Sequence, residues 1–287
     1  MVFDHDDLGD HMHSVRLSEY FINEFFLMNK NCSLADFKLE LLNTIQSTKI
    51  QNPFNYEFRN PDLLIEALTH KSFSHEVDLN LPFNERLEFL GDAVLDLVMT
   101  KKVFSLFPKS REGDLSKLRS TLVNEETLSH ISLVNSLDKL ILLGKGEIKN
   151  MGFNKSSVLS DCFEAIIGAI YEDSNFDTVE RVLIEVFDRY EKKAGVNLYS
   201  MDTLLLADPK SKLQELTMRK FKEVPKYESE EVKVDREKHF KVSVKIKEQT
   251  LATETNISKK KAMQNLAAKI LKEKIYEKVK AEGSLLC

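Results

Sequence analysis

The chain has 287 residues, of which 42% are hydrophobic and 30% charged, and it contains only 9 glycines and 6 prolines. This length and composition exclude fibrous, collagen-like and disordered proteins, and they predict about two soluble, strongly helical domains. No apolar run approaches the roughly 20 residues that span a bilayer, and the acidic start does not resemble a signal peptide, so we expect a cytoplasmic protein with no membrane partner. The three cysteines are far apart and lack CxxC spacing, so we expect reduced thiols.

The net charge of -5 conceals two regions of opposite sign. Residues 208–275 carry 18 Lys and Arg against 11 Asp and Glu, a net charge of +7, which leaves -12 for the rest of the chain. A basic module attracts phosphates, whereas an acidic body that contacts them needs cations to mask its carboxylates. The charge distribution therefore indicates a metal-using enzyme that acts on a nucleic acid.

Helical patterns dominate the first two thirds of the chain. Residues 1–50 are expected to form a helical N-terminal extension, in which Ser33 and Asp36 form a capping box before an amphipathic helix. Residues 51–195 lack any strand pattern, so we expect an all-α domain there. The helix starts predicted within this domain are Asn60-Pro61, Asp114 and Asp177.

The pattern changes after residues 196–207, which are expected to form a linker. Asp208-Pro209 predicts the start of a new helix, and Ser258 the cap of a last helix. Between them the period becomes two, with strands predicted at residues 226–232, 240–246 and 250–255. We therefore expect a small α+β domain of order α-β-β-β-α over residues 208–278, followed by a tail at 279–287.

Two pairs of carboxylates lie at helical spacing inside apolar segments. Glu88 and Asp92 are one turn apart, and so are Asp161 and Glu164, so each pair shares one helix face. The buried stripes expected beside them are Leu87, Leu90, Val94 and Leu97 in the first helix and Leu159, Phe163, Ile166 and Ile170 in the second. Desolvated acids repel one another unless a hard cation neutralises them, so the four acids predict a Mg²⁺ site, where Mn²⁺ could substitute.

A solvated helix face is the commoner reason for any one such pair in a chain with 46 acids. Two pairs set in apolar helices weaken that alternative. Gly91 adds to the argument, because a glycine inside a helix costs about 1 kcal/mol relative to alanine and usually has a packing reason. We expect a second helix to approach closely at Gly91.

These motifs resemble the ribonuclease III family, the metal-dependent endonucleases of double-stranded RNA. NERLEFLGDAVLDLV at 84–98 is similar to the family signature, and the blocks at 56–73, 112–128, 141–147 and 159–173 follow in the family order. The resemblance covers about residues 54–192 and implies a bacterial-type enzyme with one all-α endonuclease domain. It also implies a homodimer that cleaves by two-metal hydrolysis, leaving 5′-phosphate and 3′-hydroxyl ends with a short 3′ overhang.

The family roles transfer to residues of this chain by motif position. The four metal-site acids are Glu88, Asp92, Asp161 and Glu164, of which Asp92 and Glu164 are taken as catalytic. Glu85 and Glu112 match acids near the RNA or the metal shell. Phe89 matches an aromatic that enters a socket on the partner subunit at the dimer interface, although an ordinary core phenylalanine remains an alternative. None of the four acids is substituted, which counts against a catalytically silent family member.

The basic domain resembles the double-stranded RNA-binding domain, which reads RNA by shape. Lys259, Lys260 and Lys261 match its phosphate-binding lysines at a helix start, and Gln214 matches a minor-groove contact. The loop at 234–240 departs from the family, since it lacks the usual Gly-Pro and has Arg236 where histidine is common. Minor-groove insertion by that loop is therefore not predicted, whereas phosphate binding is.

Two further functions remain compatible with parts of the sequence. A catalytically silent double-stranded RNA-binding protein would keep the basic domain, and a phosphohydrolase of small molecules would not need it. Two residues of reactive type in the helical domain have simpler structural roles. Cys162 beside Asp161 is expected to be a small core residue, and His70 to pack or hydrogen-bond at a helix end.

Overall fold

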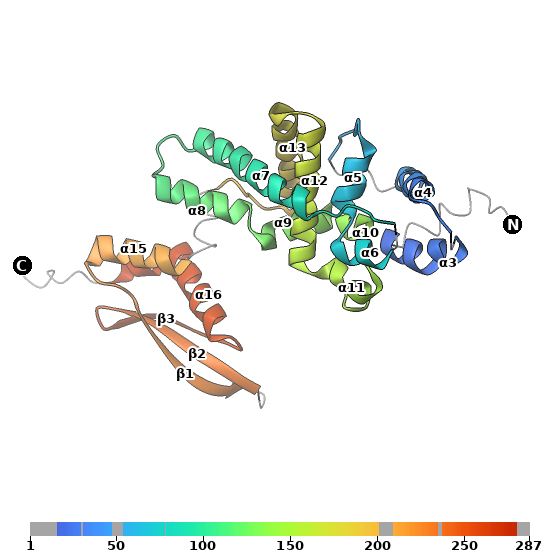
Figure 1. Cartoon of the computed structure of the whole chain (residues 1–287). Helices are drawn as coiled ribbons and strands as arrows, with labels where there is room; N and C mark the ends of the chain where they lie inside the picture. The colour runs from blue at the N-terminus through green and yellow to red at the C-terminus, as the bar shows by residue number, and fades with distance from the viewer. Residues whose placement is uncertain are drawn as a thin grey trace, which may run out of the picture. The chain divides into compact units, whose positions relative to one another are not determined.

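The computed structural model describes residues 16–29, 31–47, 54–77, 79–200, 209–234 and 237–279. The chain divides into two compact units, Met1–Leu198 and Tyr199–Cys287, drawn in Figure 1. The helix cap predicted at Asp208 and the loop residue Arg236 lie outside the described residues. None of the described helices is long and apolar enough to cross a membrane.

The first unit is helical, as the sequence predicts. In its described part the only β-type pairing is one isolated bridge between Thr69 and Leu142. Its helices are α2 (Leu17–Tyr20), the π-helix η1 (Phe21–Phe25), α3 (Phe26–Met28), α4 (Leu34–Ser47), α5 (Pro61–Leu68), α6 (Lys71–Glu76), α7 (Glu85–Leu106), α8 (Glu112–Leu122), α9 (Glu125–Val134), α10 (Leu137–Leu140), α11 (Lys145–Lys149), the 3-10 helix η2 (Gly152–Asn154), α12 (Ser156–Asp173) and α13 (Phe176–Ala194).

The N-terminal extension packs against the rest of this unit. The capping box of α4 forms as predicted: the Asp36 N–H donates to Ser33 Oγ, and the Ser33 N–H donates to Asp36 Oδ2. The rings of Phe21 and Phe37 stack edge to face at 5.1 Å, and Phe37 lies 5.9 Å from Phe73 of α6. These aromatic contacts join the extension to the helical core.

Helices α7 and α12 pack together at the centre of this unit. The approach is so close that a Cβ added at Gly91 would lie 1.8 Å from the carbonyl oxygen of Glu164. Gly168 meets α7 in the same way, since its Cβ would lie 2.1 Å from the carbonyl oxygen of Leu87. The packing reason predicted for Gly91 is therefore confirmed. The predicted stripe of α12 is also confirmed, because Leu159, Phe163, Ile166 and Ile170 are all buried.

Three local predictions are wrong. Helix α8 begins at Glu112 rather than at Asp114, because the Asp114 N–H already closes the first turn on the carbonyl of Arg111. Helix α13 begins at Phe176, since Asn175 rather than Asp177 caps it by accepting the Thr178 N–H at 3.0 Å. Leu97, expected in the buried stripe of α7, is 56% exposed. Leu87 and Val94 are buried as predicted and Leu90 is half-buried, but the buried face continues through Gly91, Leu95 and Val98, because the Gly91 contact fixes which face of α7 meets α12.

The second unit has the predicted α-β-β-β-α order. It consists of α15 (Pro209–Phe221), β1 (Lys226–Val234), β2 (Glu237–Ile246), β3 (Gln249–Asn256), α16 (Lys259–Lys272) and the 3-10 helix η3 (Ile275–Lys278). The strands form one antiparallel sheet in the order β1-β2-β3.

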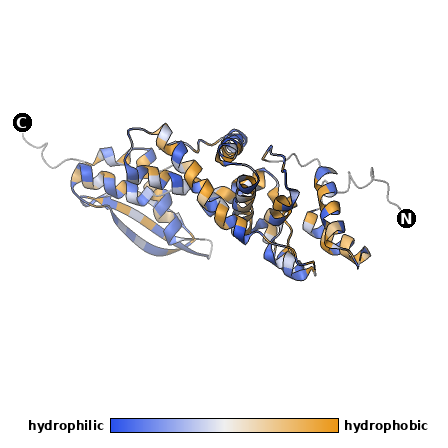
Figure 2. Cartoon of the chain, turned by 45° about the horizontal axis from the view of Figure 1, so that its top comes forward, coloured by the Kyte–Doolittle hydropathy of each residue, from blue (hydrophilic) through white to orange (hydrophobic). Residues whose placement is uncertain are grey.

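One face of this sheet forms a core with the helices. Val242, Val244 and Ile246 of β2 are fully buried and alternate with more exposed residues. Figure 2 shows hydrophobic and hydrophilic residues alternating along the strands of the sheet. The core is completed by Leu213 of α15 and by Ala262, Leu266, Ala267 and Ile270 of α16. Because α16 and the sheet share this core, the cap of α16 has a fixed place on the domain.

Candidate active site

The contact between α7 and α12 brings acidic residues from both helices together. Glu88 lies one turn before Gly91, while Asp161 and Glu164 lie on the turn of α12 that Gly91 touches. Each of these three residues offers a carboxylate oxygen that lies within 4.8 Å of the other two. The glycine contact thus positions three of the four predicted metal-site acids, Glu88, Asp161 and Glu164, as one cluster, the acid trio.

The acid trio is held in a partly desolvated environment. Burial, followed by the charges of Asp92, Asp161 and Glu88, raises the pKa of Glu164 to about 8. The pKa of Glu88 is raised by burial and then by the charge of Asp161. Burial also raises the pKa of Asp161, against the opposing effect of a hydrogen bond from Ser160. Such a cluster favours protons or a cation, because each carboxylate disfavours ionisation of the others.

Asp92 lies outside the trio. Its side chain is exposed on α7, and its charge is the strongest of the electrostatic influences that raise the pKa of Glu164. Asp92 is therefore near Glu164 without belonging to the set of oxygens that meet within 4.8 Å.

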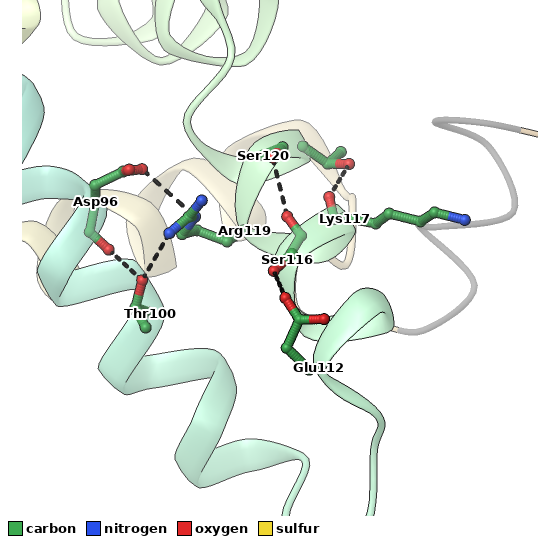
Figure 3. A network of polar contacts seen from close by, with 8 residues as sticks. Asp96, Thr100, Glu112, Ser116, Lys117, Arg119 and Ser120 are labelled. Carbon is green, nitrogen blue, oxygen red and sulfur yellow. Dashed lines mark hydrogen bonds and ion pairs between the residues drawn. The ribbon is translucent and has the colours of Figure 1, made fainter.

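Glu85 and Glu112 occupy different surroundings. Glu85 begins α7, one turn before Glu88, and accepts a hydrogen bond from Lys71 Nζ at 2.9 Å. Glu112 begins α8 and accepts a hydrogen bond from the Ser116 hydroxyl at 3.0 Å (Figure 3). After burial and nearer charges, the charge of Glu85 also contributes to the raised pKa of both Glu88 and Asp161.

A polar network joins α8 to α7 beside the acidic residues. Arg119 of α8 forms an ion pair with Asp96 of α7, with 3.6 Å between Nε and Oδ1, and reaches Thr100 Oγ1 at 3.4 Å (Figure 3). The charge of Asp96 also contributes to the raised pKa of Glu164. Arg119 therefore ties α8 to α7 at Asp96, whose charge reaches Glu164.

Sequence reasoning missed two residues near the trio. Lys71 lowers the pKa of both Glu88 and Asp161, and Glu125, the first residue of α9, raises the pKa of Asp161. Both residues lie within the sequence blocks that carry the family resemblance, but their charges face the acids only through tertiary packing. No spacing rule could have identified them.

Cys162 and His70 have the structural roles that were predicted. Cys162 is fully buried, and burial raises the pKa of its thiol to about 12, so it stays protonated at neutral pH. His70 caps α6, because its Nδ1 accepts the Ser72 N–H at 3.2 Å. Neither residue belongs to the acid trio.

The residues predicted to bind RNA lie on the surface of the second unit. Ser258 caps α16 by accepting the Lys261 N–H, and Lys259, Lys260 and Lys261 form the exposed first turn that follows. Gln214 is exposed on α15. The basic residues of β2 are arranged differently, because Lys238, Lys241 and Lys245 pair with glutamates of β1 at 2.8, 3.1 and 2.7 Å.

Phe89 points away from the core of the first unit. Its side chain is 82% exposed, so the alternative of an ordinary core phenylalanine is wrong. Leu97 and Phe104 of the same helix are also exposed. Helix α7 therefore carries an apolar surface on the side that does not pack against α12.

Comparisons with known proteins agree with this architecture. Residues 60–189 match the family described as Ribonuclease-III-like, and residues 209–274 match the double-stranded RNA binding motif. The N-terminal extension precedes both matches. Because the two matches follow the order of the two units, they assign a nuclease-type fold to the first and an RNA-binding fold to the second.

Relatives are similar over both domains. Ribonuclease 3 of Aliarcobacter butzleri is 40% identical over 231 residues, which cover 80% of this chain and 98% of that protein. Ribonuclease 3 of Campylobacter jejuni is 41% identical over 229 residues, covering 79% of this chain and 96% of that protein. A solved nuclease domain of Campylobacter jejuni ribonuclease III, described as flexible in a region involved in dimer formation, is 44% identical, with a TM-score of 0.46 over 52% of this chain and 98% of that domain. Since the curated relatives are matched almost from end to end, the chain belongs to the ribonuclease III family of double-stranded RNA endoribonucleases, which act in RNA processing.

Proposed function

We propose that this chain cleaves double-stranded RNA by Mg²⁺-dependent hydrolysis, with Glu88, Asp92, Asp161 and Glu164 as the metal-site acids. The observation that carries this proposal is the acid trio, whose carboxylate oxygens lie within 4.8 Å of one another on two helices fixed by the Gly91 contact. The raised pKa values of all three acids support it, because burial, and for Glu88 and Glu164 also neighbouring carboxylates, disfavours their ionised forms, which a bound cation would stabilise.

The donor set fits a hard divalent cation. The trio offers only carboxylate oxygens, which Mg²⁺ prefers, and contains neither the thiolates nor the imidazoles that favour softer metals. When bound, a pair of such ions supplies a hydroxide nucleophile and stabilises the departing 3′-oxygen of the cut strand. Mn²⁺ has compatible ligand preferences and is expected to substitute.

The chain itself contributes position and charge. The rigid packing of α7 on α12 holds Glu88, Asp161 and Glu164 in place, while Asp92 lies exposed beside Glu164. Asp92 and Glu164 are proposed as the catalytic acids, and Glu85 and Glu112 as acids near the RNA. No side-chain nucleophile is needed, since water attacks the phosphorus and leaves 5′-phosphate and 3′-hydroxyl ends.

Substrate affinity is assigned to the second unit. The exposed first turn of α16 presents Lys259, Lys260 and Lys261 at a helix N-terminus, where both the lysines and the helix dipole attract phosphate. Gln214 of α15 is proposed as a minor-groove contact. Division of labour between an acidic cleavage site and a basic binding domain accounts for the opposite charges of the two regions.

The active form is proposed to be a homodimer in which each acidic site cuts one strand and leaves a short 3′ overhang. Support comes from α7, where Phe89, Leu97 and Phe104 are 82%, 56% and 68% exposed. Apolar side chains of this size on one helix are typical of a protein interface. A second copy of the chain is the occupant that the family resemblance implies.

The test is incubation of the purified protein with long double-stranded RNA, with and without Mg²⁺, followed by sizing of the products and analysis of their ends. We expect short duplexes with 5′-phosphates only when the metal is present. A protein that binds the RNA but leaves it intact under every divalent-metal condition would instead be a catalytically silent RNA-binding protein.

A further inference from the structure

Lys71 is a cation at the edge of the acid trio that the proposed cleavage mechanism does not use. Its Nζ donates to Glu85 Oε1 at 2.9 Å, and the side chain is 54% exposed. Its charge lowers the pKa of both Glu88 and Asp161, and the charges of those two acids in turn raise its own, after the larger effect of Glu85. Lys71 therefore lies within electrostatic reach of acids from both α7 and α12.

The backbone of Lys71 is held firmly by its neighbours. The preceding His70 N–H donates to the carbonyl oxygen of Leu142 at 3.0 Å, and His70 Nδ1 caps α6. The following Ser72 accepts the Gly144 N–H through its hydroxyl at 3.0 Å. Both flanking residues are thus tied to the segment 142–144, so the start of the Lys71 side chain has a defined place beside the trio.

The ion pair of Lys71 with Glu85 is easily exchanged. Both side chains are about half exposed, at 54% and 50%, and such surface pairs contribute only about 0–1 kcal/mol. An RNA strand bound with its scissile phosphate at the trio also brings the neighbouring backbone phosphates to the edge of the site, each with a negative charge. The ammonium group can therefore leave Glu85 for a phosphate at little cost.

We propose that Lys71 is a phosphate-binding residue of the nuclease domain, whose ammonium group pairs with a backbone phosphate next to the one being cleaved. The cation offsets the repulsion between this phosphate and the many acids of the site, and it fixes the position of the strand over the trio. This inference rests on the proposed function, because it takes the trio as the place of cleavage.

The test compares Lys71→Gln with Lys101→Gln, each combined with Glu164→Gln so that the RNA stays intact during binding. Lys101 is a matched control, because it is 53% exposed and also paired with a glutamate, Glu180, at 2.6 Å, and it lies more than three turns beyond Glu88 on α7. The affinity for a short RNA duplex is measured in Mg²⁺ at several salt concentrations. Lys71→Gln should flatten the log-log salt dependence by about 0.9, the value for one lost phosphate contact, whereas Lys101→Gln should not.

Cleavage by proteins with an intact Glu164 gives a second readout. Lys71→Gln should raise KM about 5-fold or more with little change in kcat or in the Mg²⁺ concentration for half-maximal rate, and Lys71→Arg should restore KM. An unchanged salt dependence, or a shift in Mg²⁺ requirement alone, would overturn the proposal, since Lys71 would then only balance the charge of the acids. Failure of the proposed function itself is distinguishable, because the wild type would then leave the RNA intact in every divalent metal, or Glu164→Gln alone would cleave at the wild-type rate.

Discussion

The absence of a side chain at Gly91 allows α7 and α12, the two helices that carry the acid trio, to pack closely together. Any Cβ there would overlap the carbonyl oxygen of Glu164, which is part of the helix backbone and has little freedom to move. The same helix positions Glu88, so the distance between the acids depends directly on this glycine. Side-chain volume at one position thus determines the geometry of the site.

Gly91→Ala is expected to destabilise the protein by about 1–3 kcal/mol or more, as overpacking in a core does. Gly113→Ala is the matched control, because nothing lies within 4 Å of a Cβ at that position in α8. The control should be neutral or gain up to about 1 kcal/mol from the higher helix propensity of alanine. Thermal and urea unfolding measure both changes, and equal stability of the two variants would contradict the close helix contact.

His70 gives the helical domain a pH dependence of known sign. Burial lowers the pKa of the His70 imidazole, so the unfolded chain binds a proton near pH 6.5 more readily than the folded protein does. Stability from this residue is therefore present above about pH 6.5 and is lost as the pH falls below it. Protonation also removes the acceptor that caps α6 through the Ser72 N–H.

The variant His70→Asn keeps a capping acceptor and removes the titration. Between pH 7.5 and 5.5 the wild type should lose more unfolding free energy than the variant, as measured by urea unfolding at both pH values. The acids of the trio titrate in both proteins, so their effect cancels in the difference. A parallel pH dependence of the two proteins would show that His70 does not titrate with a shifted pKa.

At the scale of elements, α7 has one face that packs within the chain and another that is exposed. One face carries Gly91 and packs on α12, and the other presents Phe89 and Phe104 to the surroundings. Within one chain, only the face with Gly91 is buried, although both faces carry apolar side chains. We expect the exposed apolar face to be covered by a second copy of the chain. A helix with one intramolecular and one intermolecular face is expected in an obligate dimer.

Phe89→Ala is expected to weaken dimerisation by about 2 kcal/mol or more, as for a hot-spot aromatic at the centre of an interface. Sedimentation velocity at micromolar concentration should show a dimer for the wild type and dissociation for the variant. Leu27→Ala on the N-terminal extension, where the side chain is 63% exposed, should leave the dimer intact. A monomeric wild type at this concentration would contradict the interface.

The start of α16 and the strand β2 are both basic, yet only the first is expected to bind RNA. Lys259, Lys260 and Lys261 form no ion pair within the described residues, whereas the lysines of β2 are paired with β1. Replacing the three α16 lysines by glutamine should flatten the salt dependence of RNA binding by up to about three log-log units, using roughly 0.9 per phosphate. Replacing Lys238, Lys241 and Lys245 removes the same charge and should change the slope less. Equal slopes for the two triple variants would exclude the α16 lysines as specific phosphate contacts.

At the scale of the whole molecule, the sequence predicts the architecture well because its signals are local. Hydrophobic periods of 3.6 and 2 residues separate the helical unit from the sheet of the second unit, and the caps at Asn60 and Ser258 form as predicted. Local signals fail where tertiary contacts decide. Leu97 fits a helical stripe by spacing, but the Gly91 contact sets a buried face of α7 that includes Leu87 and Val94 and leaves Leu97 exposed.

The candidate site was predictable only in part for the same reason. Spacing places Glu88 and Asp92 on one face and Asp161 and Glu164 on another, but only the packing of α7 on α12 shows which oxygens meet. Asp92 lies outside the trio. The charges of Lys71 and Glu125 reach Asp161 of the trio from segments that are distant in sequence. Electrostatic surroundings arise from the fold and leave no periodic pattern in the chain.

The central claim is that the acid trio performs cleavage while the basic domain provides affinity, and Glu164→Gln tests it most directly. This substitution keeps the size of the side chain and removes the charge of the acid whose pKa is raised to about 8. Because a metal-holding carboxylate acts where charge develops in the transition state, the variant should cut long double-stranded RNA about 10²-fold more slowly in Mg²⁺. It should still shift the same RNA in a gel at the wild-type protein concentration. Cleavage at the wild-type rate would contradict the account, since the trio would then be a surface cluster without a part in the reaction.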